Sequence, residues 1–352
     1  TKVIKFHNIN VVLCLNKISH KRVINLGLEE VVDGIILLDS IKSIVTLIVR
    51  ANNEGGVIFS TVSIRNAVFS FLVGMLVKRS VYFIRNANSW LFYSNHKGLF
   101  HQKLLRYTST TLKKIMLYKC KYLIVESDQI KKYLSNYTAK RIEVVPYKYF
   151  SSNNISANKQ SKTLTYVVPG VVDVEKKPLD VIFSSLRKVS HENRSVIKIV
   201  LLGRVLDDKG RRFCEKIKEE FGESIIYFDK FVTPEVFNSY IKEASFILSS
   251  FRLKQEDKYL KEVYGTTKGS GVFGQAISYG KPLIVSSGFK VPEAIKSSTL
   301  YFSNEDELFN IFKIYINNNS VYSTIREKSV MNSRLFTVQN IAEHVNLSMW
   351  GI

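Results

Sequence analysis

The feature that most constrains the fold is an alternation of short apolar runs with helical patterns, which occurs twice along the chain. Strands that alternate with helices predict βαβ units and a parallel sheet. A polar stretch without apolar periodicity, residues 151–162, separates the two series and is typical of a linker. We therefore predict an α/β protein with two doubly wound, Rossmann-like domains, residues 1–162 and 163–335, facing a central cleft.

The first series predicts strands at Val11–Leu15, Gly34–Leu38, Val57–Ser60, Val81–Arg85, Tyr122–Glu126 and Ile142–Val145. Its predicted helices lie near Ile41–Val49, Ile64–Val77, Gly98–Tyr118 and Asp128–Ser135. The second series predicts strands at Leu164–Val168, Ile197–Leu202, Ser224–Phe228, Phe246–Ser249, Leu283–Val285 and Leu300–Phe302. Its predicted helices lie near Leu179–Lys188, Arg212–Phe221, Pro234–Glu243, Val272–Tyr279 and Glu305–Ile316. The last residues, 336–352, have a helical pattern and are expected either to cross back to the first domain or to dock on their own domain.

Charge is concentrated in the first half of the sequence. The chain has a formal net charge of +21, and residues 1–165 hold 25 Lys and Arg against 8 Asp and Glu, a net charge of +17. Such an excess implies an acidic partner, either nucleic acid or an anionic membrane surface. Between residues 97 and 148, basic residues alternate with apolar ones at near-helical spacing, namely Phe100, Leu104, Tyr107, Leu112, Ile115 and Met116. This pattern predicts a basic amphipathic helix on a membrane surface, and the alternative is a helix docked on its own domain with its lysines in water.

Cysteine usage and apolar runs bear on the cellular compartment. The three cysteines, Cys14, Cys120 and Cys214, are too scattered for a disulfide framework or a zinc site, which favours a reducing, cytoplasmic location. The longest apolar run, Ala67–Val77, falls well short of the roughly 20 residues that cross a bilayer, so we expect a buried core helix there. The first residues show no pattern of a secretory signal peptide.

The stretch from Tyr264 to Ser287 carries the clearest chemical signal. Glycines at 265, 269 and 271 surround Lys268, and the predicted helix Val272–Tyr279 follows at once. Backbone N–H groups that glycines expose, the positive end of a helix and a lysine together predict a phosphate cradle, whereas glycines that serve only a tight loop are the alternative. Residues 269–274 also match G-x-G-x-x-G, but a charged loop, residues 251–263, separates this motif from the preceding strand, which disfavours a nicotinamide dehydrogenase.

Four segments, taken in order, resemble the donor-binding domain of GT-B glycosyltransferases, and most of all the retaining, nucleotide-sugar-dependent enzymes called GT4-like. They are residues 169–180, 200–203, 227–250 and 264–287, and the likeness covers about half of the chain. The resemblance implies that Lys268 to Gly271 hold the diphosphate of the donor, that Gln275 contacts the ribose and that the backbone at Phe231 and Val232 contacts the base. The donor-binding residues that it implies are Gly170, Lys176, Lys177, Arg204, Phe231, Val232, Thr267, Lys268, Gly269, Ser270, Gly271 and Gln275.

The sequence departs from this family at three positions. Thr267 and Gln275 stand where the family usually has two glutamates, eight residues apart, so the contact of Gln275 with a ribose hydroxyl lacks charge assistance. The family's arginine ahead of the lysine is also absent. We therefore expect Lys176, Lys177 or Arg204 to neutralise the diphosphate.

The first half of the sequence resembles the family only in outline. Residues 81–90 occupy the place of the acceptor site, which makes Arg85, Asn86 and Asn88 candidate catalytic or acceptor-binding residues, and a structured turn in which asparagines cap the backbone is the alternative. His7 and His96 are candidates for a general base, whereas His101 falls in the basic helix.

The resemblance implies a hexosyltransferase that moves a sugar from a nucleotide-diphosphate sugar to a lipid-linked or oligosaccharide acceptor, in synthesis of a bacterial capsule, lipopolysaccharide or other surface polysaccharide. It implies no cofactor and no metal, because helix dipoles and basic side chains stabilise the leaving diphosphate. The expected location is cytoplasmic, peripheral on the inner face of the plasma membrane. Two alternatives remain: a sugar-nucleotide epimerase of the same fold, and a basic nucleic-acid-binding α/β protein. No nucleic-acid-binding motif occurs in the sequence.

Overall fold

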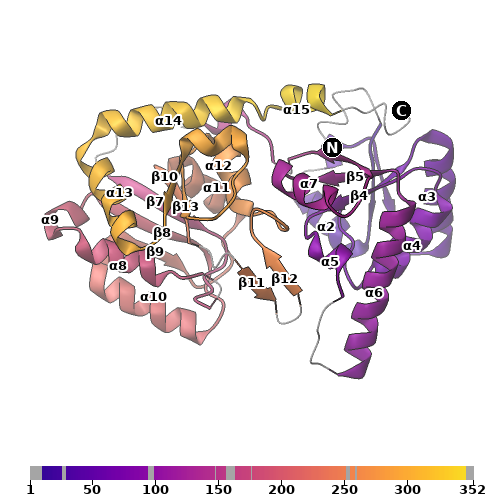
Figure 1. Ribbon diagram of the computed structural model, residues 1–352, viewed down its shortest axis with the longest axis horizontal. Helices are drawn as coiled ribbons and strands as arrows, with labels where there is room; N and C mark the ends of the chain where they lie inside the picture. The colour runs from indigo at the N-terminus through magenta and orange to yellow at the C-terminus, as the bar shows by residue number, and fades with distance from the viewer. Residues whose placement is uncertain are drawn as a thin grey trace.

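The computed structural model describes residues 10–25, 29–93, 99–146, 148–155, 163–175, 177–250, 254–257 and 260–345. Over these ranges the chain forms two α/β units, which we call the first half (residues 10–155) and the second half (residues 163–337). Figure 1 shows the two halves beside each other, with the hairpin of β11 (Lys254–Asp257) and β12 (Leu260–Val263) reaching from the second half toward the first.

The second half is built on a sheet of six parallel strands. In chain order they are β7 (Leu164–Pro169), β8 (Ile197–Arg204), β9 (Ile225–Phe228), β10 (Phe246–Ser249), β13 (Leu283–Ser286) and β14 (Thr299–Phe302). Their order in the sheet is β14-β13-β10-β7-β8-β9, and each neighbouring pair is parallel. This is the doubly wound order, in which the chain starts in the middle of the sheet and reverses direction once. All six strands were predicted from their apolar runs.

Helices cover both faces of this sheet. They are α8 (Asp180–Lys188), α9 (His191–Arg194), α10 (Asp208–Phe221), α11 (Pro234–Glu243), α12 (Gly271–Tyr279), α13 (Glu305–Asn317) and α14 (Asn319–Arg334). Along β8, Ile199 and Leu201 join one hydrophobic cluster, whereas Val200 and Leu202 join another on the opposite face. Successive side chains of a strand point to opposite faces, so these two clusters show that both faces are buried.

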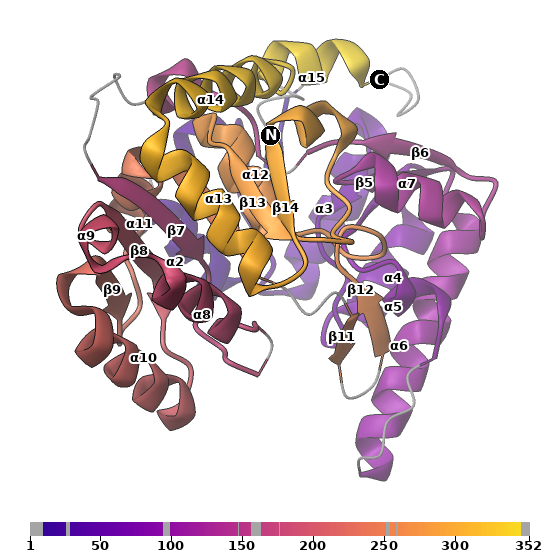
Figure 2. The ribbon, with the colours of Figure 1, turned by 60° about the vertical axis from the view of Figure 1, so that its left-hand side comes forward.

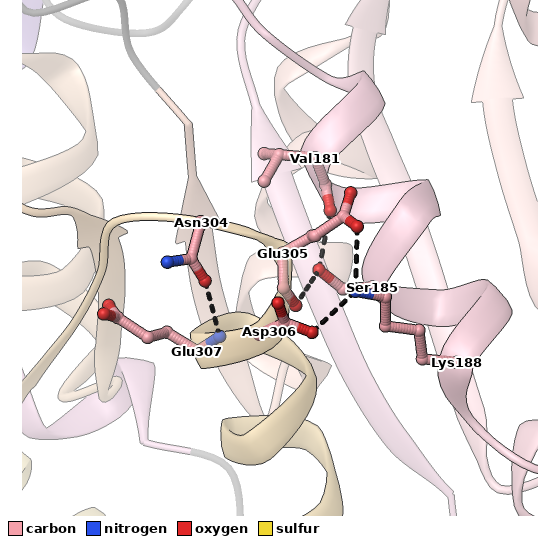
Figure 3. Close-up of polar contacts among 7 residues, drawn as sticks. All are labelled: Val181, Ser185, Lys188, Asn304, Glu305, Asp306 and Glu307. Atoms are coloured by element: carbon pink, nitrogen blue, oxygen red, sulfur yellow. Dashed lines mark hydrogen bonds and ion pairs between the residues drawn. The ribbon is translucent and has the colours of Figure 1, made fainter.

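The contact between α8 and α13 shows how polar groups are satisfied between these helices (Figure 3). The Ser185 hydroxyl donates to the carbonyl oxygens of Val181 and Glu305, at 2.6 and 2.9 Å. Lys188 forms ion pairs with Glu305 and Asp306, and Asn304 caps α13 by accepting from the backbone N–H of Glu307. The helices are thereby held in register on one face of the sheet.

The first half has the same alternation but a smaller sheet. Its strands are β1 (Val12–Leu15), β2 (Gly34–Leu37), β3 (Val57–Phe59), β4 (Ser80–Ile84), β5 (Tyr122–Val125) and β6 (Arg141–Val144). Its helices are α2 (Lys17–Asn25), α3 (Ile41–Glu54), α4 (Ala67–Leu76), α5 (Asn88–Leu91), α6 (Phe100–Lys119) and α7 (Asp128–Ser135). Strands β3 to β6 form a parallel sheet in chain order, and β1 and β2 form a separate parallel pair. The predicted α/β architecture of two parallel-sheet units is confirmed.

Two of our predictions about helices in the first half are wrong in part. We expected a fully buried helix at residues 67–77, but α4 buries only one face, and Leu72 and Leu76 on the other face are exposed. We also expected the apolar residues of α6 to form a single stripe. Instead Met116 is buried against the sheet, whereas Leu104 and Ile115 are exposed. An apolar pattern identifies a helix, but it does not tell which of two apolar faces meets the core.

The last described helix, α15 (Val338–His344), lies against the first half. Ile341 and Val345 share a hydrophobic cluster with Val81 of β4 and Ile124 of β5. The backbone N–H of Phe150 also donates to the carbonyl oxygen of Phe336, at 2.8 Å. The chain therefore crosses the second half along α14, and α15 follows on the first half, as Figure 2 shows.

Within the described ranges, no helix combines the length and the apolar character that a membrane span needs. Over the same part of the chain, no three His, Cys, Asp or Glu side chains come together as ligands of a metal ion would. The three cysteines are all free thiols.

Candidate functional site

The glycine-rich bend ahead of α12 is a tight turn. The carbonyl oxygen of Val263 accepts from the backbone N–H groups of Thr266, Thr267 and Lys268, at 2.9–3.2 Å. Gly265 has a φ of +73°, and a Cβ there would collide with the backbone of Lys290, so only glycine fits. The next helix, α12, starts directly after this turn and so directs its N-terminal N–H groups toward it.

The bend lies at the boundary between the two halves. The backbone N–H of Ala87 donates to the carbonyl oxygen of Thr267 at 2.7 Å, and Asn86 and Lys268 form an antiparallel bridge. A Cβ on Gly269 would overlap the carboxylate of Glu126, which follows β5. Two of the sequence-predicted groups, residues 85–88 and residues 267–271, are thus brought together in space.

A buried carboxylate, which the sequence reasoning missed, joins these segments. Glu262 in β12 is buried, and its side chain accepts from the backbone N–H of Ser89 at 3.2 Å and from the Thr267 hydroxyl at 2.5 Å. Burial raises the pKa of Glu262, and these hydrogen bonds oppose the shift. Thr267, which the resemblance to GT4-like enzymes aligns with a glutamate, is therefore next to a carboxylate that comes from five residues earlier.

A buried cation on the first-half side, Lys113 of α6, interacts electrostatically with Glu262. Its side chain is only 6% exposed, and burial lowers its pKa to about 8, against the opposing field of Glu262. Its Nζ atom also lies 5.9 Å from the ring centroid of Trp90. Buried groups of opposite charge from the two halves thus act on each other across the boundary.

A second group of predicted residues lies at the carboxyl ends of β7 and β8. Gly170 follows β7 with a φ of +90°, and a Cβ on Gly203 would collide with the Gly170 backbone, so the two turns approach closely. The Lys177 Nζ atom donates to the carbonyl oxygen of Pro169 at 3.0 Å, and burial lowers its pKa to about 8. Arg204 ends β8 and is exposed. The carboxyl edge of a doubly wound sheet is where ligands bind.

Two serines at the end of β10 have unsatisfied hydroxyl groups. Ser249 and Ser250 are fully buried, and among the residues that the structure describes neither hydroxyl has a hydrogen-bond partner. Strand β10 pairs with β7, so these hydroxyls lie near the same sheet edge as Gly170. Buried polar groups normally find partners, and a bound ligand or water would account for these two.

The other predicted residues have separate surroundings. Gln275 of α12 accepts at 3.0 Å from Lys148 of the first half, whose pKa is lowered by burial. Phe231 is exposed and Val232 is buried, in the connection between β9 and α11. Arg85 follows β4, and its charge opposes the rise that burial causes in the pKa of Glu126. Three further candidates, His7, His96 and Lys176, lie outside the described residues.

The halves are closed at the bend. A cavity of about 50 Å³ lies there, and it is lined among others by Glu126, Ser127, Lys148, Ser270, Phe273 and Gly274. This volume admits a few water molecules, whereas pockets for organic ligands measure roughly 300–1,000 Å³. A large ligand at the bend would need the halves to move apart there.

This chain is similar to known proteins in its structure but not in its sequence. No known protein-family profile matches the chain. No curated protein sequence matches it either. Among solved structures, a glycosyltransferase from Rickettsia africae has a TM-score of 0.63 at 14% identity and covers 99% of this chain and 91% of its own. HepE of Anabaena, in complex with UDP, has a TM-score of 0.60 at 12% identity, with 90% and 86% covered.

A third structure, the sucrose-phosphate synthase of Thermosynechococcus elongatus, has a TM-score of 0.53 at 13% identity, with 86% and 76% covered. All three align with more than four fifths of this chain, and at identities this low such likeness shows the fold alone. The predicted fold is therefore confirmed: this chain has the GT-B fold of nucleotide-sugar glycosyltransferases.

Proposed function

We propose that this protein is a glycosyltransferase that takes a hexose from a nucleotide-diphosphate sugar. The observation that carries the proposal is the bend at residues 265–271, which places Lys268 and the start of α12 at the boundary between the halves, opposite residues 85–89. HepE of Anabaena, which has the same fold, was solved with UDP and with UDP-glucose. The fold and the position of the bend together support the same class of donor here.

In the proposed reaction a hydroxyl of the acceptor forms a bond to the anomeric carbon of the donor sugar, and the bond from that carbon to the diphosphate breaks. The electron pair of that bond leaves with the nucleoside diphosphate, and the hydroxyl proton passes to a base, for which His7 and His96 remain our candidates. Lys268, the N–H groups at the start of α12, and Lys177 or Arg204 would stabilise the charge that develops on the diphosphate. These groups supply the positive charge without a metal ion, which is also part of the proposal.

The acceptor side of the proposal rests on the first half. Arg85, Asn86 and Asn88 follow β4 at the boundary, where they would hold the hydroxyl-bearing end of a glycan. We propose a lipid-linked acceptor of a bacterial surface polysaccharide, handled by a peripheral protein at the inner membrane surface. The excess positive charge of the first half supports this choice, because anionic lipids attract such a surface.

Donor binding requires a local rearrangement. The Glu126 carboxylate stands over Gly269, and a diphosphate at this place would be repelled by that charge. We therefore propose that the halves separate at the bend before the donor enters, and that Glu126 moves away from Gly269 in this step. Retention of the anomeric configuration, as in the GT4-like enzymes, also stays a proposal.

Thermal unfolding with nucleotides tests the donor site. We expect one of UDP, GDP, ADP, CMP and TDP, at millimolar concentration, to raise the melting temperature by a few degrees, since a ligand at 100 times its Kd stabilises by about 2.7 kcal/mol. Lys268→Ala should weaken the affinity about tenfold by removing a charge-assisted contact. Lys216→Ala, at an exposed position of α10, is the matched control and should bind as the wild type does. If none of the five nucleotides changes the melting temperature, the donor site is not where we place it.

A further inference from the structure

Helix α4 exposes an apolar face that the fold of its own half does not use. Its ten residues include no charged side chain. Ala67, Ser70 and Val73 are buried against the sheet, whereas Val68, Leu72, Met75 and Leu76 on the opposite face are 47–60% exposed. Residues spaced in this way lie on one side of a helix, so the exposed side chains form a continuous stripe.

Helix α6 packs beside α4 and extends this exposed surface. Its buried side is formed by residues such as Thr110, Lys113 and Leu117, and its opposite side exposes Leu104, Tyr107, Ile115 and Tyr118. The amino-terminal end of α6 projects beyond the rest of the first half (Figures 1 and 2). We call the exposed sides of α4 and α6 together the outer helical face. Exposed apolar side chains that line two adjacent helices indicate an interaction site.

The charge along the segment that contains α4 and α6 has a single sign. Residues 55–125, which include both helices, contain 11 Lys and Arg and no Asp or Glu. Lys103 and Lys114 lie at one edge of the exposed side of α6, and Lys119 lies at the other. The Lys114 Nζ atom is 4.0 Å from the ring centroid of Tyr93, which stacks on Tyr107 at 4.5 Å. Any partner of this face must therefore accept both apolar side chains and the lysines along the edges of α6.

We propose that the outer helical face binds an anionic lipid bilayer, with the apolar stripes of α4 and α6 in the interfacial layer and the lysines among the headgroups. Helices that lie on membranes combine Leu, Phe or aromatic residues on one side with Lys and Arg around it. The cores of protein–protein interfaces are instead depleted of lysine, which disfavours a protein partner here. The inference deepens the membrane location proposed above and names the surface responsible.

Vesicle binding tests this proposal separately from the transferase activity, because it needs neither a nucleotide sugar nor an acceptor. The purified full chain is sedimented with vesicles of phosphatidylcholine alone and with vesicles that contain 30% phosphatidylglycerol, at two salt concentrations. We expect at least tenfold stronger binding to the anionic vesicles, and weaker binding at high salt. Absence of binding to the anionic vesicles would overturn the proposal while leaving the donor site untouched.

Two substitutions test whether the outer helical face contacts the vesicles. Leu72→Glu on α4 and Leu104→Glu on α6 each put a negative charge at an exposed position, and together they should reduce vesicle binding at least tenfold. Met331→Glu, at a 66% exposed position on α14 of the second half, is the matched control and should bind as the wild type does. A thermal melt of each variant checks that it is folded.

Three outcomes would contradict the assignment of this face. The double variant binds vesicles as tightly as the control does. A dimeric wild type becomes monomeric in the double variant, which would make the face an interface between copies of the chain. Single-stranded DNA displaces the wild type from the vesicles, and it displaces the double variant and the Met331→Glu control just as well. This result would place the binding site for the acidic partner on another surface.

Discussion

The two halves of this molecule use apolar side chains in different ways. In the second half, apolar residues from both faces of the sheet are covered, and Tyr166, Phe246 and Phe312 pack ring against ring in the interior. In the first half, the outer helices leave whole apolar stripes in contact with water. The same alternation of strands and helices is therefore compatible with either a covered unit or a unit that leaves apolar side chains of one face exposed.

The net charge also differs between the two halves. The first 165 residues carry a net charge of +17, and residues 166–352 hold 26 Lys and Arg against 22 Asp and Glu, a net of +4. Both segments contain a parallel sheet with a buried core, so the excess charge is not needed for folding. We expect this excess to serve association rather than stability, as proposed above.

The largest expected difference between the halves concerns a buried ring. Phe246 is fully buried and stacks on Tyr166 with 5.2 Å between ring centroids. Phe246→Ala should lower the free energy of unfolding by about 3–5 kcal/mol, because it leaves a cavity in a closed core. Leu72→Ala, at an exposed apolar position of the first half, should change it by no more than about 0.5 kcal/mol. Urea unfolding followed by circular dichroism measures both. Equal losses would mean that the exposed stripe on α4 is part of a core after all.

A smaller effect is expected where the halves meet. Glu262→Ala removes the acceptor for the Ser89 backbone and the Thr267 hydroxyl, and it leaves Lys113 buried without its counter-charge. Unpaired buried groups of this kind cost about 1–3 kcal/mol, so the variant should lose that much stability in urea. Glu262→Gln keeps one acceptor oxygen and should recover part of it.

The control for this variant is an exposed glutamate that forms an ion pair with a lysine. Glu223 is 98% exposed and pairs with Lys218, and exposed ion pairs contribute about 0–1 kcal/mol. If Glu262→Ala destabilises no more than Glu223→Ala does, the buried carboxylate does not hold the halves together. The closed arrangement at the bend would then rest on the backbone contacts of Ala87 and Asn86.

The strands of the parallel sheets in both halves are the part of the fold that the sequence predicted best. Strands buried on both faces are continuous apolar runs, and Ile197–Leu202 identified β8 for that reason. The start of α7 also has a residue type typical of helix caps, because Ser127 accepts from the backbone N–H of Ile130. Local patterns that report burial therefore sufficed for the sheet strands, whereas helices α2 and α14 were not predicted.

Features that depend on distant partners could not be predicted. The β11–β12 hairpin has charged residues, and the pattern indicated a loop there. Glu262 is buried because Ser89, 173 residues away, donates to it, and no local pattern reports such a partner. For the candidate site, the sequence located the bend at residues 265–271 but gave no sign of Glu126 over Gly269. The roles of Lys268, Gln275 and the other site residues stay predictions.

The smallest expected effects test whether the halves are independent. Asp207 caps α10 in the second half by accepting from the Gly210 N–H at 2.8 Å, and Ser127 caps α7 in the first half through a longer bond of 3.5 Å. Asp207→Ala should cost about 1 kcal/mol, because a charged cap also interacts with the helix dipole, and Ser127→Ala about 0.5 kcal/mol.

Hydrogen exchange measures which backbone amides lose protection when a cap is removed. Because each cap acts on its own helix, Ser127→Ala should lower amide protection around α7 and leave the strands of the second half unchanged, and Asp207→Ala should do the reverse. Asp207→Asn and Ser127→Thr, which keep a side-chain acceptor, should retain most of the protection. Equal loss of protection in both halves from either alanine variant would show that the closed bend makes them open as one unit. The contrast between a closed half and an open half would then describe surfaces only and not separate folding units.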